Sequence, residues 1–112
     1  MKIVDQWVVK DWFRDNFCGC GYPDEAIAFL REVFNIFEER KLDSYFINQD
    51  QLKILEDKYT RGVITFVLYT IDSSGLTEHG GTVNACWLTD TGKEFVKMFK
   101  EFTNEEIEEL VL

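Results

Sequence analysis

Residues 71–95, IDSSGLTEHGGTVNACWLTDTGKEF, contain most of the features that decide the fold. Gly75 can adopt the left-handed conformation that ends a helix, and Leu76 can then fold back as its hydrophobic partner. The apolar run that comes before, 63–71, is rich in β-branched residues, which favours a buried strand. Its length and its glycine ending favour a buried helix instead. We expect a helix over 63–71, with the strand as the alternative.

The second part of the quoted stretch predicts a β-hairpin at about 76–88. Gly80 and Gly81 permit the positive φ angles of a tight two-residue turn, and the residues on both sides of them are suited to strands. A turn at this point would place His79 opposite Thr82. We therefore expect one hairpin, with the histidine close to its turn.

Helical spacing of apolar residues surrounds the hairpin. Two helices are expected in the first half of the chain, over 4–17 and from Pro23 to about Lys41. A short third helix is expected through Leu52, Ile54 and Leu55. After the hairpin we expect a helix with a core face of Phe95, Met98, Phe99 and Phe102, followed by a short acidic C-terminal helix. The expected N-cap residues are Asn48 or Asp50, Thr89 or Asp90, and Thr103, which forms a capping box with Glu106. Arg61 and Gly62 are expected to interrupt the helical pattern before residue 63. The elements predict an α+β fold, mainly α, in a single domain, 1–112.

The segment 68–102 resembles the second half of a winged-helix domain. In that family a helix that ends in a glycine leads into a strand, a wing, a second strand and a closing helix opened by Leu-Thr-x-x-Gly, which is present here as residues 88–92. The resemblance implies a winged-helix-like helical core. Together with this ending, residues 18–26, CGCGYPDEA, are also similar to small proteins of bacterial and phage origin, which implies a phage or mobile-element source.

Winged-helix proteins that read DNA carry basic and polar side chains on the recognition helix. The corresponding segment here, 63–72, contains no Lys or Arg. Lys93, Lys97 and Lys100 form a short basic stripe on the closing helix, but glutamates lie close to it in sequence, so a solvated face is the better interpretation. A DNA-binding transcriptional regulator is therefore the alternative function and not the favoured one.

The charge balance points to the same conclusion. The chain has 112 residues, of which 46% are hydrophobic, and 21 acidic against 12 basic side chains leave a net charge of −9. Such a charge repels phosphate backbones and anionic lipids and favours basic protein surfaces. Without a membrane-length apolar run or an apolar leader, we expect a cytoplasmic protein that binds neither membrane nor cofactor.

Three cysteines and one histidine raise the question of a metal site. Cys18, Cys20, His79 and Cys86 supply the ligand types of a Cys₃His zinc centre, although Cys-x-Cys is tighter than the usual zinc spacing. The simpler interpretation is that Cys86 is a small buried hydrophobe and that the other two thiols lie in a helix connection. A small zinc or thiol protein is the second alternative. A catalytic Cys/His pair is disfavoured because the tight turn would keep His79 away from Cys86.

The favoured hypothesis is a non-enzymatic protein-interaction domain. Its acidic C-terminus would bind a basic partner through Glu101, Glu105, Glu106, Glu108 and Glu109. An exposed aromatic patch, for which Trp7, Trp12 and Trp87 are the candidates, would add affinity or form a homodimer. One concrete form is an inhibitor that occupies a nucleic-acid-binding groove as an acidic mimic.

Overall fold

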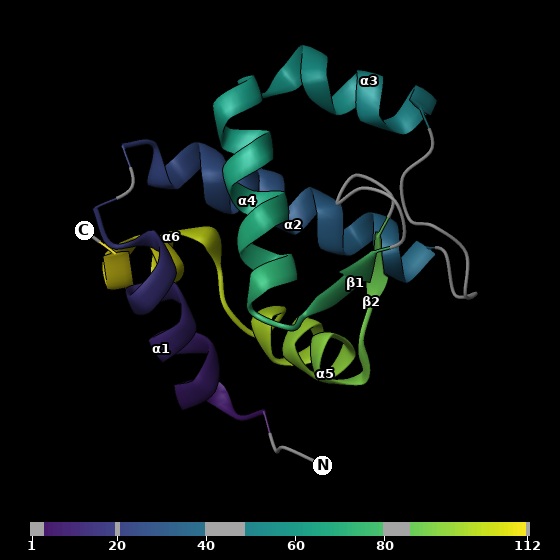
Figure 1. Cartoon of the computed structure of the whole chain (residues 1–112). Helices are drawn as coiled ribbons and strands as arrows, with labels where there is room; N and C mark the ends of the chain where they lie inside the picture. Colours follow the sequence, from purple (N-terminus) through teal and green to yellow (C-terminus); the bar gives the residue numbers. More distant parts are fainter. Residues whose placement is uncertain (1–3, 20, 40–48, 80–85, 112) are drawn as a thin grey trace.

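The computed structural model describes residues 4–19, 21–39, 49–79 and 86–111 (Figure 1). The elements in chain order are α1 Gln6–Phe17, α2 Pro23–Glu39, α3 Gln49–Lys58, α4 Arg61–Ser73, β1 Thr77–His79, β2 Cys86–Leu88, α5 Asp90–Phe99 and α6 Asn104–Val111. The fold class is α+β, mainly α, with one β-hairpin and a C-terminal helix, which confirms the prediction.

Helix α1 is fixed at both ends by local chemistry. The Asp5 carboxylate accepts hydrogen bonds from the amides of Trp7 and Val8, both at 3.0 Å, and so caps the first turn. The helix ends at Phe17, and Gly19 follows with φ +83°, a conformation that side chains other than glycine rarely adopt. Its buried residues share an i, i+4 spacing: Val9, Phe13 and Phe17.

Helix α2 is the central helix, and it packs against both α4 and α6 (Figure 1). An apolar stripe of Ala26, Leu30, Val33 and Phe37 is buried in full, and so is Phe29 beside it. Ile36, beside the stripe, is half-buried. The broad apolar face therefore serves two neighbours, as predicted. The expected continuation to Lys41 lies outside the described residues.

The turn between α3 and α4 lies closer to the N-terminus than the sequence predicted. The expected break at Arg61 and Gly62 is wrong, because these residues form the first turn of α4 and the chain turns at Tyr59 and Thr60 instead. Gly62 needs no special backbone conformation here, so its presence did not mark a break. Asp50 lies inside α3 and is not its cap, while the other candidate, Asn48, lies outside the described residues.

The segment 63–71 is helical, which settles the ambiguity between helix and strand in favour of the predicted helix. After the helix ends, Gly75 has φ +79°, and the amide of Leu76 donates to the Ile71 carbonyl at 3.0 Å. Leu76 is buried. This is the predicted glycine-terminated helix end with its hydrophobic partner.

The predicted hairpin is present, but the prediction of a tight turn at Gly80–Gly81 is wrong. Strands β1 and β2 are antiparallel, and His79 pairs with Cys86 rather than with Thr82. The connection therefore spans 80–85, which lies outside the described residues. A glycine pair permits a tight turn without requiring one. In the observed register Thr77 and Cys86 are buried.

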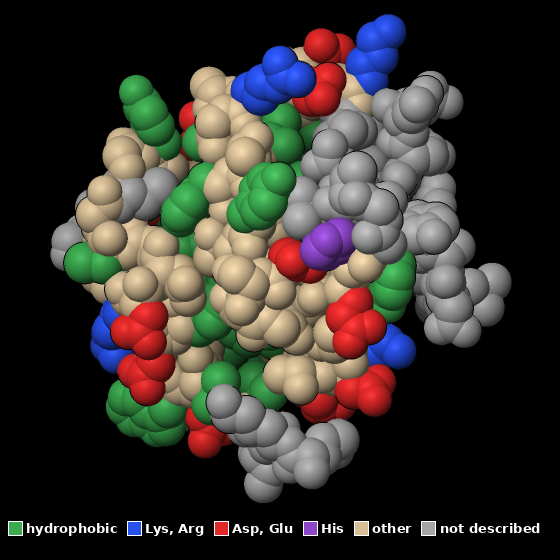
Figure 2. Space-filling model, in the orientation of Figure 1, with side chains coloured by type: hydrophobic (Ala, Val, Ile, Leu, Met, Phe, Trp, Pro, Cys, Tyr) green, Lys and Arg blue, Asp and Glu red, His purple; other side chains and the backbone are tan. Residues whose placement is uncertain are grey.

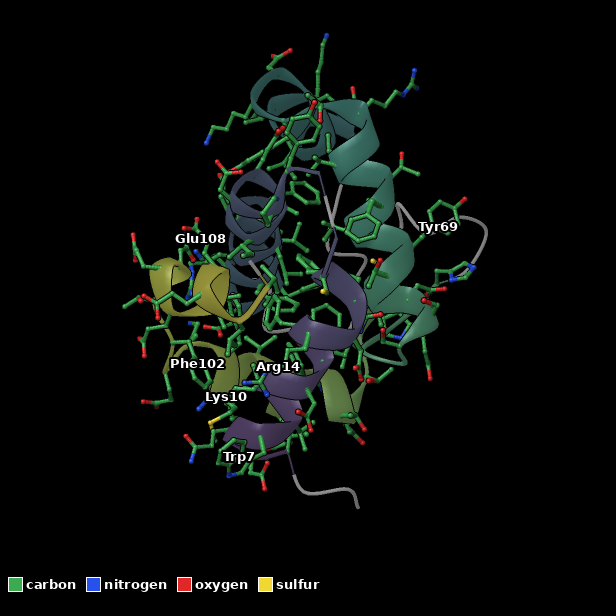
Figure 3. The ribbon with its side chains drawn as sticks, turned by 90° about the vertical axis from the view of Figure 1, so that its left-hand side faces the viewer. Trp7, Lys10, Arg14, Tyr69, Phe102 and Glu108 are labelled. Atoms are coloured by element: carbon green, nitrogen blue, oxygen red, sulfur yellow. The ribbon has the colours of Figure 1, made fainter. Side chains whose placement is uncertain are left out.

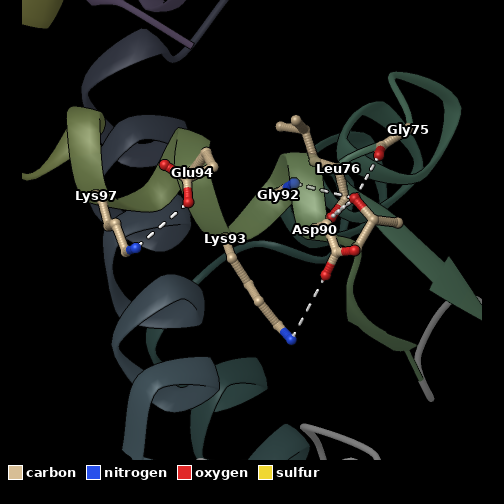
Figure 4. A network of polar contacts seen from close by, with 8 residues as sticks. Gly75, Leu76, Asp90, Gly92, Lys93, Glu94 and Lys97 are labelled. Atoms are coloured by element: carbon tan, nitrogen blue, oxygen red, sulfur yellow. Dashed lines mark hydrogen bonds and ion pairs between the residues drawn. The ribbon is translucent and has the colours of Figure 1, made fainter. Parts of the chain in front are cut away.

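Helix α5 is joined to the hairpin by a compact polar network (Figure 4). The Thr89 hydroxyl accepts from the Gly92 amide at 3.0 Å and donates to the Gly75 carbonyl at 2.8 Å, so the predicted cap also ties α5 to the end of α4. Gly92 packs so closely that an added Cβ would lie 2.0 Å from the Leu76 carbonyl oxygen. Glycine is required at this position for steric reasons.

Helix α5 ends at an earlier residue than the apolar spacing predicted. Helix α5 ends at Phe99, so Phe102 belongs to the following turn and is half-buried, not part of the helix core face. The predicted capping box is confirmed: the Glu106 amide donates to the Thr103 hydroxyl at 3.1 Å, and the Glu106 carboxylate accepts from the Thr103 amide at 2.9 Å.

Aromatic side chains dominate the core between α1, α2 and α5. The rings of Phe13 and Phe99 stack at 5.5 Å, and Phe34 meets Phe99 edge to face at 5.4 Å. Trp12 is half-buried and packs its indole against Phe95 at 5.0 Å.

No helix within the described ranges combines the length and apolarity needed to cross a bilayer.

Candidate functional site

Helix α6 presents an acidic face to solvent. It buries Ile107 and Val111, with Leu110 half-buried, against α1 and α2. The predicted glutamates divide by exposure: Glu101, Glu105, Glu106 and Glu109 are exposed, whereas Glu108 is half-buried. Because the apolar and acidic residues occupy opposite sides of one short helix, burial of the first set directs the second into water.

Arg31 of α2 fastens this acidic segment to the body of the protein. Its Nε donates to Asn104 Oδ1 at 2.5 Å and its Nη2 to the Phe102 carbonyl at 2.7 Å, while the guanidinium lies 4.2 Å from the centroid of the Phe99 ring. Burial lowers the pKa of Arg31, and the nearby charge of Glu105 opposes this effect. The start of α6 is therefore held by a charge-assisted fork, not by packing alone.

Most of the predicted partner-binding glutamates remain available for a partner. Glu106 is used in the capping box. Among the residues that the structure describes, Glu101, Glu105, Glu108 and Glu109 make no ion pair within 4.0 Å. The segment thus carries uncompensated negative charge.

Trp7, Lys10 and Phe102 form an aromatic cluster beside the acidic segment (Figure 3). The Lys10 ammonium lies 4.7 Å from the Trp7 ring centroid and 5.9 Å from that of Phe102. Trp7 is 58% exposed. Of the three tryptophans weighed from the sequence, Trp12 and Trp87 are half-buried, so Trp7 is the one that presents its ring to solvent. Sequence spacing did not indicate the part of Phe102, because it placed this residue in the core.

The basic stripe on α5 is neutralised within the molecule, as the solvated-face interpretation expected. Lys93 lies 4.0 Å from Asp90 and Lys97 lies 3.3 Å from Glu94 (Figure 4). Lys100 is paired with Glu38 of α2. Each ammonium therefore has a carboxylate partner, and the stripe carries little free positive charge for a phosphate backbone.

The exposed side of α4 is aromatic and not basic. Figure 2 shows hydrophobic and neutral side chains over α4 in the middle of this face, with Lys and Arg towards its edges. Tyr69 is 58% exposed, and Phe66 is exposed next to Phe17, with ring centroids 5.5 Å apart. Arg61 is exposed at the start of the helix. The sequence predicted a buried helix here, but two of its aromatic side chains are exposed.

The thiols do not assemble into a metal centre within the described part of the chain. Cys18 is exposed and Cys86 is buried, and no group of three His, Cys, Asp or Glu side chains there could hold a metal ion. Cys20 lies outside the described residues. Burial, with a contribution from the negative charge of Asp72, raises the pKa of the Cys86 thiol to about 12. At neutral pH this thiol is protonated, a poor metal ligand and a poor nucleophile.

His79 occupies a different environment from the expected one. It lies opposite Cys86 in the hairpin, and its Nδ1 is 2.8 Å from Asp72 Oδ1 at the end of α4. The histidine is exposed, and its imidazole has Asp72 as a partner. The pair joins β1 to α4. The Cys86 thiol, which lies opposite His79, is protonated at neutral pH, and this argues against its use as a nucleophile.

Comparison with known proteins gave no match: no protein-family model, curated protein or solved structure is significantly similar to this chain.

Proposed function

We propose that this chain is a non-enzymatic protein-interaction domain that docks on a basic partner protein through its acidic C-terminal segment. We define the docking surface as Glu101 together with the exposed side of α6. The supporting observation is the amphipathic character of α6, which buries Ile107 and Val111 while holding unpaired carboxylates in water. Negative potential of this kind speeds encounter with a positive surface and favours the correct orientation.

The rigid attachment of α6 supports the proposal. A flexible acidic tail would lose conformational freedom on binding, whereas a preorganised charged face loses less. Here the Arg31 fork and the Thr103 capping box hold the first turn of α6 in place. The carboxylates are therefore presented at fixed spacings, which a partner built to bind regularly spaced phosphates can recognise.

In its specific form the proposal is an inhibitor, encoded by a phage or mobile element, that occupies the nucleic-acid groove of its target. The resemblance of 68–102 to winged-helix domains would then describe a scaffold that serves protein contact. The uncharged exposed side of α4, with Phe66 and Tyr69, supports this use. A mimic of this type competes with DNA or RNA for the same basic surface.

The test is retention of a basic protein from a bacterial lysate at about 0.15 M salt, where only close charge contacts act strongly. The immobilised variant Glu101→Lys/Glu105→Lys/Glu109→Lys is compared with a matched control, Glu56→Lys/Asp57→Lys/Glu78→Lys, which changes net charge equally at exposed carboxylates elsewhere. We expect the wild type and the control to retain the same basic protein and the α6 variant to lose it. Added double-stranded DNA should displace it.

The outcome that contradicts the proposal is equal retention by both triple variants, because binding would then follow net charge alone. Circular dichroism of each variant establishes that the helices are intact, since Glu105 lies near Arg31. Retention that persists in excess DNA would keep the docking surface but exclude the nucleic-acid-mimic form.

A further inference from the structure

We propose that the faces of Trp7 and Phe102 form a docking site for an arginine side chain of the partner protein, and that Lys10 occupies this site in the free protein. This inference rests on the proposed function and deepens it, because it names the chemical group that the partner inserts beside the acidic segment. The partner is a cationic protein segment that carries at least one arginine.

The position of Lys10 is the first argument. Its ammonium lies near two aromatic faces, at 4.7 Å from the centroid of Trp7 and 5.9 Å from that of Phe102. It makes no ion pair within 4.0 Å among the described residues, although carboxylates are abundant on this protein. The molecule's own cation therefore marks a place where two ring faces attract positive charge.

The site can be vacated. Trp7 is 58% exposed and Lys10 is half-buried, and both belong to the first turns of α1, so moving the lysine side chain into water disturbs no core packing. Indole is the aromatic ring that attracts cations most strongly. Guanidinium is planar and more weakly hydrated than ammonium, and it stacks on aromatic faces. An incoming arginine is therefore a better occupant than the resident lysine.

The charges around the site select for a cationic segment. Glu101 precedes Phe102 in the same turn, and Glu105 and Glu109 follow on α6, which packs against α1. The neighbouring cation on α1, Arg14, is balanced by Asp11 at 3.5 Å. Figure 3 shows Trp7, Lys10 and Phe102 on the side of the molecule that also carries Glu108. When one arginine of the partner segment lies on the rings, the basic residues on either side of it in that segment can reach these carboxylates.

The experiment measures binding of two synthetic peptides, octa-arginine and octa-lysine, by isothermal titration calorimetry at about 0.15 M salt. Lys10→Met removes the resident cation and keeps its apolar stem. Arg14→Met is the matched control, because it removes one positive charge from the same helix, where Arg14 is paired with Asp11. We expect Lys10→Met to tighten octa-arginine binding about two- to fivefold beyond the effect of Arg14→Met.

Removing the ring should have the opposite effect. Trp7→Ala should weaken octa-arginine binding about fivefold and octa-lysine binding less, because arginine gains more from stacking. Equal effects of Lys10→Met and Arg14→Met, or unchanged affinity of Trp7→Ala, would overturn the inference. If the Glu101→Lys/Glu105→Lys/Glu109→Lys variant still loses both peptides in that case, the docking surface stands and only the arginine site fails.

Discussion

The junction of α4, the hairpin and α5 and the face formed by α1 and α6 are built in opposite ways. At the junction, the Thr89 hydroxyl donates to the Gly75 carbonyl at the end of α4 and accepts from the Gly92 amide, and Gly92 packs against the Leu76 carbonyl. At the α1–α6 face, Arg31 holds the start of a helix on which Glu105, Glu108 and Glu109 make no ion pair within 4.0 Å among the described residues. The polar groups of the first region serve the fold, whereas the proposed function requires the second region to keep its charges for a partner.

From this difference we expect substitutions in the first region to change the free energy of unfolding and substitutions in the second to change binding. Groups whose partners lie within the chain contribute to the free energy of unfolding, so their removal destabilises the protein. Exposed, unpaired charges contribute little to that free energy and can be changed with small structural consequence. The contrast between the two regions can therefore be tested by measuring stability at each.

The largest effect is expected for Gly92→Ala in the junction. The new methyl group would lie 2.0 Å from the Leu76 carbonyl oxygen, so α5 and the hairpin must separate. We expect a loss on the order of 3 kcal/mol in the free energy of unfolding, measured by urea denaturation. Gly62→Ala is the control: nothing lies within 4 Å of its added Cβ, and stability should stay equal or rise by up to about 1 kcal/mol. Similar losses at both glycines would contradict the steric argument.

The next effect concerns the anchor of the α1–α6 face. Arg31→Met removes both hydrogen bonds of the fork and should lower the free energy of unfolding by about 2 kcal/mol. Hydrogen exchange should show α6 opening before the rest of the molecule. Arg14→Met, an exposed arginine with one ion pair, should change stability by less than about 0.5 kcal/mol. If α6 exchanges no faster in the Arg31 variant, the anchor is not what holds the helix.

Alkaline pH should weaken the hairpin side of the junction. The thiol of Cys86 has a pKa of about 12 in the fold against its ordinary value of 9.0, so the folded state binds the proton more tightly than the unfolded chain. Its contribution is fully present below pH 9 and is lost as pH rises towards 12, with a slope of at most about 1.4 kcal/mol per pH unit.

The check for Cys86 is the difference in pH slope between the wild type and Cys86→Ala from pH 9 to 11. The comparison is needed because the raised pKa of Tyr59, caused by burial and by its hydrogen bond to Glu32, adds a slope of the same sign above pH 10. Identical slopes would contradict a buried, protonated thiol. Iodoacetamide should label Cys18 in the folded protein and Cys86 only on unfolding.

The smallest effect is expected on the outer side of the α1–α6 face. Glu101→Lys/Glu109→Lys should change the free energy of unfolding by less than about 0.5 kcal/mol, because both side chains are exposed and unpaired within the described residues. Thermal unfolding followed by circular dichroism provides the measurement. A loss as large as that of Arg31→Met would mean that these carboxylates stabilise the fold, which removes the distinction between the two regions.

Local patterns predicted most of the fold. The helix end at Gly75, the cap at Thr89 and the capping box at Thr103 depend on interactions among residues fewer than six positions apart, so the sequence contains them in full. The hairpin register was missed because two glycines permit a tight turn but do not select it. The register joins His79 to Cys86, a pairing that the residues of the turn do not encode.

For the candidate surface, three features could be read from residue type and spacing alone: the excess of acidic charge, the amphipathic pattern of the last helix and the absence of cations between residues 63 and 72. Helix packing, by contrast, brings Arg31 to the start of α6 and Lys10 to the ring of Phe102. Those contacts join residues about 70 to 90 positions apart, and no local spacing encodes such distances because they depend on how the helices pack.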